Sequence, residues 1–220
     1  MGFLSNLTGK KTTDSTTPAA PAPSSASTTP TSGSISLKKG DSISLKKTAS
    51  ASIIAENGWT AKKKDYDLKA LVRYRDGRTI YIGAANRDEK LSTSEGAVRH
   101  SGDVPKGSKD LERITIAWHK DIASVALSSY SAIENGTGSF KQYGVYVNIV
   151  NDDQVVGISA ADASAASTSY TLCFGEVVFR PDQSFEVTNL EMYSRANSEN
   201  RVGYDGEKVR MDIGPIGQKK

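Results

Sequence analysis

The chain has 220 residues and one cysteine, and its 28 basic and 25 acidic residues leave a formal net charge of only +3. This near-balance and the lack of a recognition motif argue against nucleic-acid binding, and the single Cys173 rules out an intramolecular disulfide. No run of about 18 apolar residues predicts a membrane-spanning helix and no secretory signal peptide is visible, so a cytoplasmic location is expected.

The first part of the chain, residues 1–33, is rich in Ser, Thr, Ala and Pro. Such a segment has too little apolar surface to offset the entropy of ordering it, so a disordered tail is predicted. Its tip, MGFLSNLTGKK (1–11), ends in two lysines, and Phe3, Leu4 and Leu7 would share one side of a short helix there. The tip is expected either to fray or to make a peripheral contact with a protein partner or a membrane surface.

A near-exact repeat opens the predicted fold: SISLKK, a Gly-Asp pair and SISLKK again, over residues 34–47. Each copy alternates apolar and polar residues, as a half-buried strand does, and the Lys-Gly-Asp between them favours a turn. The repeat therefore predicts a β-hairpin. The side chains expected to face inward are Ile35, Leu37, Ile43 and Leu45.

Alternating stretches and short apolar runs predict strands along the rest of the chain. Their expected positions are 53–59, 66–74, 79–82, 114–118, 122–127, 143–150, 155–159, 170–179, 185–193 and 209–213. The first of these strands is expected to break at Asn57-Gly58. The strands at 170–179 and 185–193 are expected to form a closing hairpin around a turn at 180–183.

Many short strands between turn signals, without a long helical period, predict an all-β fold, a two-sheet antiparallel β-sandwich. The sandwich is assigned to residues 34–193, and a polar C-terminal extension, 194–220, follows it. Cys173 falls in one of the apolar runs, and no His or Asn pairing motif accompanies it. A buried structural thiol is therefore predicted rather than a nucleophile.

The loop between His100 and Ile114 concentrates carboxylates, glycines and a proline between two predicted strands. Asp103, Asp110 and Glu112 lie on or beside it. Oxygen-rich loops of this kind suit a hard cation such as calcium, which takes about six to eight oxygen ligands. An ordinary polar loop, in which Asp103 makes a turn hydrogen bond, is the alternative.

Several stretches, taken in their order and spacing, resemble the tellurium-resistance TerD family of bacterial, calcium-binding β-sandwich proteins. They are the opening repeat, Gly58-Trp59, the strand YDLKALV (66–72), the loop HSGD (100–103) with DLE (110–112), and CFGEVVF (173–179). Together they cover roughly residues 35 to 193. The resemblance implies a cytoplasmic stress-response protein, linked by family to tellurite resistance.

By this resemblance, the positions that match the family's calcium ligands are Asp67, Asp103, Asp110 and Glu112. The sequence departs from the family pattern, because Lys69 replaces the second aspartate of the strand motif and Thr60 replaces the Asp after Gly-Trp. Same-face strand neighbours lie about 7 Å apart, so at an effective dielectric near 20 a lysine opposes a divalent cation by about 5 kcal/mol. Two hypotheses follow: weak calcium binding persists through the four carboxylates, or the Lys69 ammonium takes the ion's place and pairs with them.

Neither histidine, His100 or His119, belongs to an arrangement that predicts catalysis, so a non-enzymatic role is expected. The first functional hypothesis is a TerD-like stress or tellurite-resistance protein that acts as an interaction module on protein partners. The second is a structural or assembly protein that reuses the sandwich and self-assembles, in a phage particle, a filament or a secretion apparatus. A surface carbohydrate-binding sandwich is disfavoured because no signal peptide is visible.

Overall fold

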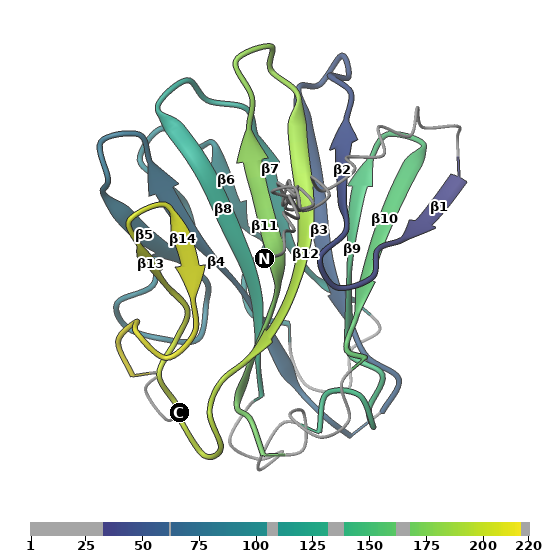
Figure 1. Cartoon of the computed structure of the whole chain (residues 1–220), viewed down its shortest axis with the longest axis vertical. Coiled ribbons are helices and arrows are strands. Elements are labelled where there is room, and N and C mark those ends of the chain that lie inside the picture. Colours follow the sequence, from purple (N-terminus) through teal and green to yellow (C-terminus); the bar gives the residue numbers. More distant parts are fainter. Residues whose placement is uncertain (1–32, 62, 105–109, 132–138, 162–167, 217–220) are drawn as a thin grey trace, which may run out of the picture.

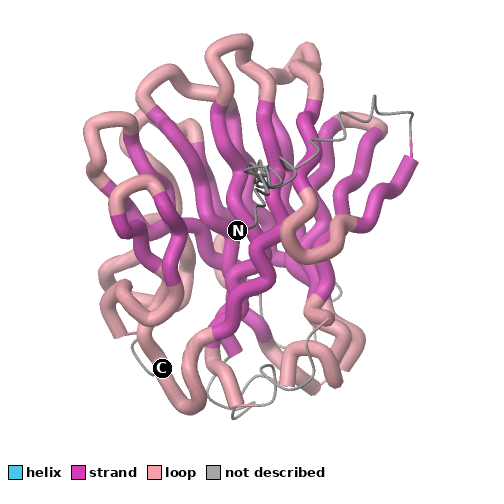
Figure 2. Tube along the Cα trace, in the orientation of Figure 1, coloured by secondary structure: helices cyan, strands magenta, loops and turns pink. Residues whose placement is uncertain are grey.

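The computed structural model describes residues 33–61, 63–104, 110–131, 139–161 and 168–216. Within these ranges the chain forms strands, turns and bends but no helix (Figure 2). A long apolar helix that could cross a bilayer is therefore absent from this described part of the chain. Residues 1–32 of the predicted disordered tail, including its tip, lie outside the described residues, whereas Gly33 already belongs to the first strand.

Two six-stranded sheets face each other as a β-sandwich, which confirms the predicted fold class (Figure 1). Sheet A has the order β1-β10-β9-β3-β7-β6 and is antiparallel except for the parallel pair of β1 and β10. Its strands are β1 (Gly33–Ser36), β3 (Ser52–Gly58), β6 (Val98–His100), β7 (Glu112–Ala117), β9 (Tyr146–Asn151) and β10 (Gln154–Ser159). Sheet B has the order β2-β12-β11-β8-β4-β5 and is antiparallel throughout. Its strands are β2 (Ser42–Leu45), β4 (Tyr66–Tyr74), β5 (Thr79–Ile82), β8 (Ile122–Ser131), β11 (Thr171–Phe179) and β12 (Phe185–Tyr193).

The opening repeat does not form the predicted hairpin. Its first half, β1, pairs with β10 in sheet A, and its second half, β2, pairs with β12 in sheet B. The turn between them passes from one sheet to the other through Gly40, whose φ is +87° and whose N–H donates to Asn189 O at 2.8 Å. A hairpin of two four-residue strands is marginal in water, whereas two larger sheets provide backbone partners for both strands. Leu37, Ile43 and Leu45 still face inward and are buried, as predicted.

The strand β3 continues through Asn57-Gly58, where a break was predicted. Asn57 pairs with Glu112 of β7, and Gly58 pairs with Tyr146 of β9. The buried Asn57 amide donates to Tyr66 O at 2.9 Å and to Ser129 Oγ at 3.2 Å, so it bridges the two sheets. A Cβ at Gly58 would collide with the Tyr146 ring. Packing in the sandwich therefore overrides the local turn preference of Asn-Gly.

The main hydrophobic core lies between the sheets. In β4, the alternate residues Tyr66, Leu68, Ala70, Val72 and Tyr74 face this core and are buried, as the period-two pattern predicted. The intervening residues face outward, and Asp67 and Lys69 are among them. The predicted closing hairpin of β11 and β12 is also present.

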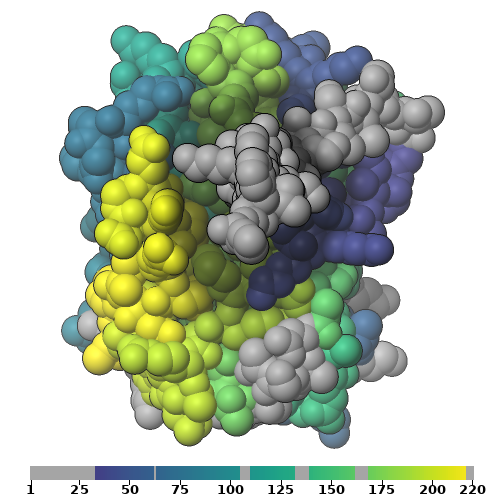
Figure 3. Space-filling view, in the orientation of Figure 1, coloured from purple at the N-terminus to yellow at the C-terminus, as the bar shows by residue number. Residues whose placement is uncertain are grey.

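The C-terminal residues form a third layer on the outer face of sheet B. A two-stranded hairpin, β13 (Gly203–Asp205) and β14 (Lys208–Arg210), replaces the single strand predicted at 209–213. In Figures 1 and 3 this segment, drawn in yellow, lies in front of sheet B. Its contacts with the sheet form a second apolar cluster, whose buried members are Leu71, Ala126, Cys173, Val202 and Val209. Cys173 is thus a buried free thiol, as predicted.

Candidate metal centre

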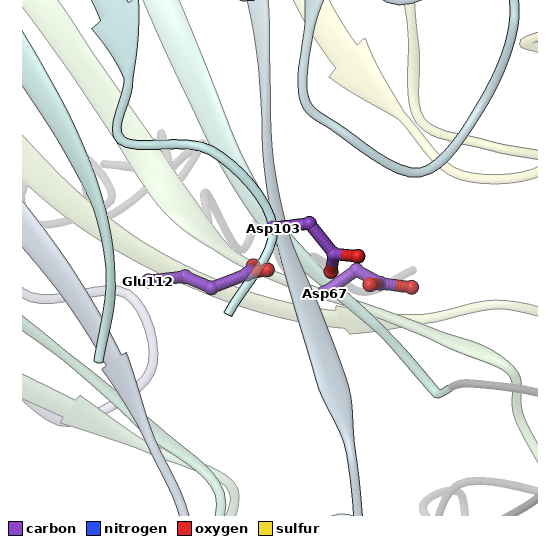
Figure 4. Close-up of side chains that lie close together, drawn as sticks. All are labelled: Asp67, Asp103 and Glu112. Carbon is purple, nitrogen blue, oxygen red and sulfur yellow. The ribbon is translucent and has the colours of Figure 1, made fainter. Parts of the chain in front are cut away.

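Three of the four predicted ligands come together at one edge of the sandwich. Asp67 lies on β4, Asp103 lies on the loop after β6, and Glu112 begins β7. One carboxylate oxygen from each lies within 4.8 Å of the other two (Figure 4). Asp67 is 9% exposed, Glu112 is 3% exposed, and Asp103 is exposed to solvent. The group is therefore closed on the protein side and open on the loop side.

The cluster forms where β4 extends beyond its neighbour. Strand β5 pairs with β4 only over Ala70–Arg73, so the backbone groups of Leu68 have no strand beside them on that edge. The Leu68 N–H donates to Glu112 Oε2 at 2.5 Å, and Leu68 O lies 3.0 Å from His100 Nε2. Two side chains of sheet A thus provide hydrogen-bond partners for the N–H and C=O of Leu68 at the edge of sheet B, as buried backbone groups require.

His100 also holds the loop that carries Asp103. Its Nδ1 accepts a hydrogen bond from the Gly102 N–H at 3.0 Å, so the proton of the neutral ring is assigned to Nε2, which donates to Leu68 O. Gly102 has a φ of +100°, a conformation that side chains rarely adopt. The Ser101 N–H donates to Arg113 O at 2.8 Å. Asp103 is therefore presented by a loop that is fixed at three successive residues.

The negative charges of the three close carboxylates repel one another and favour the binding of a cation. Two unit charges 4.8 Å apart repel by about 3 kcal/mol at an effective dielectric near 20. Partial relief comes from local donors: Glu112 Oε1 lies 3.4 Å from the Val104 nitrogen, and its Oε2 accepts the hydrogen bond from the Leu68 N–H. A bound cation would relieve the repulsion more fully, since carboxylate oxygens retain free lone pairs after one hydrogen bond.

Lys69 does not take the ion's place, and the second of the two sequence hypotheses is wrong. Its ammonium donates to Glu89 Oε1 at 2.7 Å and lies 5.0 Å from the centre of the Tyr130 ring. The side chains of Lys69 and Glu89 are only 4% and 1% exposed. The lysine is therefore committed to a buried ion pair on the outer face of sheet B, beside the carboxylate cluster and not inside it.

Glu89 is the centre of a charge network that the sequence did not predict. Besides Lys69, its carboxylate accepts hydrogen bonds from the N–H groups of Ala85 and Asn86 at 3.0 and 2.9 Å and lies 3.3 Å from Arg201 Nη1. Arg201, from the C-terminal layer, also pairs with Asp88. Burial acts to raise the pKa of Glu89, but the charge and hydrogen bond of Lys69, together with the hydrogen bonds from Asn86, outweigh it and hold this pKa below its ordinary value. No short motif indicated these partners, because they meet only in the folded chain.

The fourth predicted ligand, Asp110, is exposed and is not part of the group of three. It lies two residues before Glu112, and residues 105–109, which connect it to the Asp103 side of the loop, lie outside the described ranges. Its role as a ligand stays a prediction.

The sequence of one known protein agrees with the resemblance read from the motifs. No family model matches the chain. The chain is 27% identical over 169 residues to the "Tellurium resistance protein TerD" of Alcaligenes sp., and the match covers 66% of this chain and 83% of that protein. A solved structure, "Crystal structure of unknown function protein SAV2460", superposes with a TM-score of 0.48 at 13% identity and covers 67% of this chain and 90% of the other. The chain is thus a distant relative of a TerD protein over about two thirds of its length.

Proposed function

We propose that this chain is a non-enzymatic, TerD-like stress or tellurite-resistance protein that works as a cation-dependent interaction module. The observation that carries the proposal is the convergence of Asp67, Asp103 and Glu112 within 4.8 Å, at positions that the TerD resemblance marks as ligands. The sequence similarity to a TerD protein supports the same assignment. A cytoplasmic site of action and protein partners, rather than nucleic acid, belong to this proposal.

The donor set suits calcium. All three groups are carboxylates, and hard oxygen ligands favour calcium or magnesium over zinc and copper, which prefer nitrogen and sulfur. Calcium fits better than magnesium, because it accepts irregular geometry and a mixture of carboxylate, carbonyl and water ligands. Asp110 is the natural candidate for a further ligand, since it belongs to the same loop.

Such an ion would join the two sheets through side chains. Asp67 belongs to sheet B, whereas Glu112 and the loop of Asp103 belong to sheet A. Because Asp103 is the exposed member, its carboxylate is the part of the cluster that calcium would draw toward β4. The surface around Asp103 is therefore the one whose charge would change with calcium, and it is where a calcium-dependent partner would bind.

The charge of Lys69 weakens this binding less than the sequence alone implied. Its positive charge is paired with Glu89, and the neighbouring Arg201 is paired with Glu89 and Asp88. Two cations and two carboxylates leave this network without net charge. The opposing energy of about 5 kcal/mol, calculated for an uncompensated lysine, is therefore an upper bound.

The non-enzymatic part of the proposal rests on where the reactive groups lie. Cys173 is buried beneath the C-terminal layer, and burial raises its pKa to about 12, so it does not form a thiolate at neutral pH. Both ring nitrogens of His100 are engaged in backbone contacts. His119 lies on a surface turn, with its Nδ1 3.9 Å from Asp121 Oδ2. None of these groups is set for nucleophilic or acid–base chemistry.

Calorimetric titration of calcium into the chelator-treated full chain tests the proposal. The expected result is a saturable heat that is lost in Asp103→Asn, because this change removes a charged ligand on the open side while keeping the shape of the side chain. Asp182→Asn is the matched control, since Asp182 lies on the exposed turn between β11 and β12. If the wild-type chain takes up no calcium, or if both variants bind it equally well, the cation-dependent function is rejected.

A further inference from the structure

The outer faces of the two sheets differ. The C-terminal layer covers sheet B with the second apolar cluster, so the residues facing outward from β4, β8 and β11 include the buried Leu71, Ala126 and Cys173 (Figures 1 and 3). On sheet A the outward residues of β3, β7, β9 and β10 are half-buried or exposed, apart from Gly58 at the end of β3. The outer face of sheet A is thus the broad sheet surface that the described residues leave accessible.

A row of three aliphatic side chains and one threonine, called the aliphatic row below, crosses the middle of this face. The strand register places Val155 of β10 beside Val150 of β9, Val150 beside Ile54 of β3, and Ile54 beside Thr115 of β7. Ile54 is 36% exposed. Antiparallel sheets that face water usually carry polar residues at such positions, so a continuous row of β-branched side chains is a feature of a covered face.

Polar residues surround the aliphatic row. The row ends in Ser34 of β1 on one side and Arg99 of β6 on the other, both exposed. The next row along the strands contains an ion pair between Arg113 Nε and Glu56 Oε1 at 2.7 Å. An apolar centre with a polar rim is the usual anatomy of a protein–protein interface.

We propose that this face binds a second copy of this chain, sheet A against sheet A, around a two-fold axis that runs along the strands between β3 and β9. These strands are the central pair of the six, so an axis between them overlays the whole face on itself. A two-fold interface requires self-complementarity, because each residue pair then occurs twice. The strand register allows this requirement to be checked pair by pair.

The pairs that the axis brings together are complementary. In the aliphatic row, Ile54 of one copy meets Val150 of the other, and Thr115 meets Val155. At the end of the row, Arg99 meets Ser34 and not a second arginine. No like charges face each other along this row. A face-to-face dimer requires this, because buried like charges cost several kcal/mol.

The second row is complementary in shape as well as charge. In one copy, Gly157 pairs with Asn148, Asn148 with Glu56, and Glu56 with Arg113. Across the axis, Glu56 meets the amide of Asn148, which can donate to it, and the long Arg113 side chain meets Gly157, which leaves room for it. The Glu56–Arg113 ion pair within each copy is preserved.

The area of the face sets the expected strength. Six strands about 4.8 Å apart, with three to seven residues each at about 3.3 Å per residue, give roughly 500 Å² per copy, or about 1,000 Å² in all. This is the lower limit for a specific interface, which predicts weak, micromolar association and not an obligate dimer. The inference does not involve the carboxylate cluster, so dimerisation and calcium binding can fail independently.

Sedimentation velocity of the full chain from about 1 to 100 µM tests the proposal. The expected result is a monomer–dimer equilibrium in the wild type and a dissociation constant raised about tenfold or more in Ile54→Lys and in Thr115→Lys, which place charge in the aliphatic row. Thermal unfolding checks that the variants fold. If Ile54→Lys does not fold, Thr115→Lys still tests the interface, because it disturbs the packing of the sheet less. The matched control is Ile213→Lys, because Ile213 is also an exposed aliphatic residue but lies on the C-terminal layer. This variant should dimerise like the wild type.

Three outcomes would overturn the proposal. The first is a wild-type chain that stays monomeric at the highest concentration. The second is a dimer that both row variants leave intact while Ile213→Lys disrupts it, because the interface would then lie on the other side of the molecule. The third is a monomer that binds vesicles of phosphatidylcholine and phosphatidylglycerol through Ile54, because the face would then serve a lipid surface.

Discussion

Glu112 Oε2 accepts a hydrogen bond from the Leu68 N–H at 2.5 Å, so a carboxylate of sheet A pairs with a backbone group at the edge of strand β4 in sheet B. The same carboxylate belongs to the acidic cluster with Asp67 and Asp103. Glu112 therefore serves the fold and the proposed cation site together, and the two roles can be separated by substitution.

Glu112→Gln is expected to keep the fold and lose calcium. The glutamine oxygen can still accept from Leu68, but the side chain loses the negative charge that attracts the ion. Glu112→Ala also leaves the buried Leu68 N–H without a partner, which should lower the free energy of unfolding by about 1–3 kcal/mol. Urea unfolding with calorimetric calcium titration measures both effects. An alanine variant as stable as the wild type would show that the edge contact contributes nothing to stability.

The sequence predicted this site in part because a strand alternates. Period two placed Asp67 and Lys69 on one face of β4, opposite the core residues, and the structure confirms that arrangement. The same rule cannot say what a side chain on that face touches, and one of the two hypotheses placed the Lys69 ammonium against the carboxylates of the loop. Its partner Glu89 lies on a loop without a motif, and Arg201 arrives from a C-terminal layer that was predicted only as a polar extension.

The errors in the predicted fold have a related origin. The opening repeat has the local pattern of a hairpin, and Asn57-Gly58 has the composition of a turn. Both preferences amount to a few kcal/mol at most, less than the gain from pairing with long strands and filling the core between sheets. Local propensity therefore located the strands, whereas the packing of the whole sandwich decided which strands became neighbours.

The double variant Lys69→Met/Glu89→Gln, which removes one positive and one negative charge of the buried pair, is expected to change calcium affinity by less than about tenfold. An ammonium already paired with Glu89 opposes the ion weakly, whereas an unpaired one at the same distance would oppose it by about 5 kcal/mol, or three decades. Calorimetric titration of the variant measures the difference. The single variant Lys69→Met is the comparison, because it leaves Glu89 with one positive partner fewer and should bind calcium more tightly than the wild type. An increase in affinity of a hundredfold or more in the double variant would mean that Glu89 does not neutralise the lysine.

The buried pair of Lys69 and Glu89 also predicts an unequal response to its two deletions. Removing Glu89 leaves the buried cations Lys69 and Arg201 without their shared partner, and Glu89→Ala should cost about 3–5 kcal/mol. Removing Lys69 leaves Glu89 with Arg201 and its backbone donors, so Lys69→Met should cost less. Chemical denaturation of both variants tests the order. Equal costs would indicate that Arg201 does not support Glu89.

The network should make stability depend on pH in the acid range. The pKa of Glu89 is held below its ordinary value of 4.5 in the folded chain, so the unfolded chain binds its proton first as pH falls. Stability from this group is present above the unfolded pKa and is lost as pH falls through the folded pKa. Glu89→Gln is therefore expected to lose stability mainly at neutral pH and to approach the wild type as the pH falls below 4.5 and through the folded pKa of Glu89. Urea midpoints between about pH 3 and 7 test this, and parallel curves for the two proteins would contradict it.

Cys173 reports on the C-terminal layer. The thiol is fully buried, contacts the second apolar cluster, and has its pKa raised to about 12 by burial, so it should react with a thiol reagent only after the layer opens or the chain unfolds. Val202→Asp places a charge in this cluster and is expected to raise the labelling rate of Cys173 at least tenfold while the sandwich stays folded. Ile213→Asp, exposed on the same layer, is the control and should leave the rate unchanged. Fast labelling in the wild type would show that the layer does not seal sheet B. Slow labelling in Val202→Asp, with the sandwich intact, would show that strands β8 and β11 protect the thiol without help from the C-terminal residues.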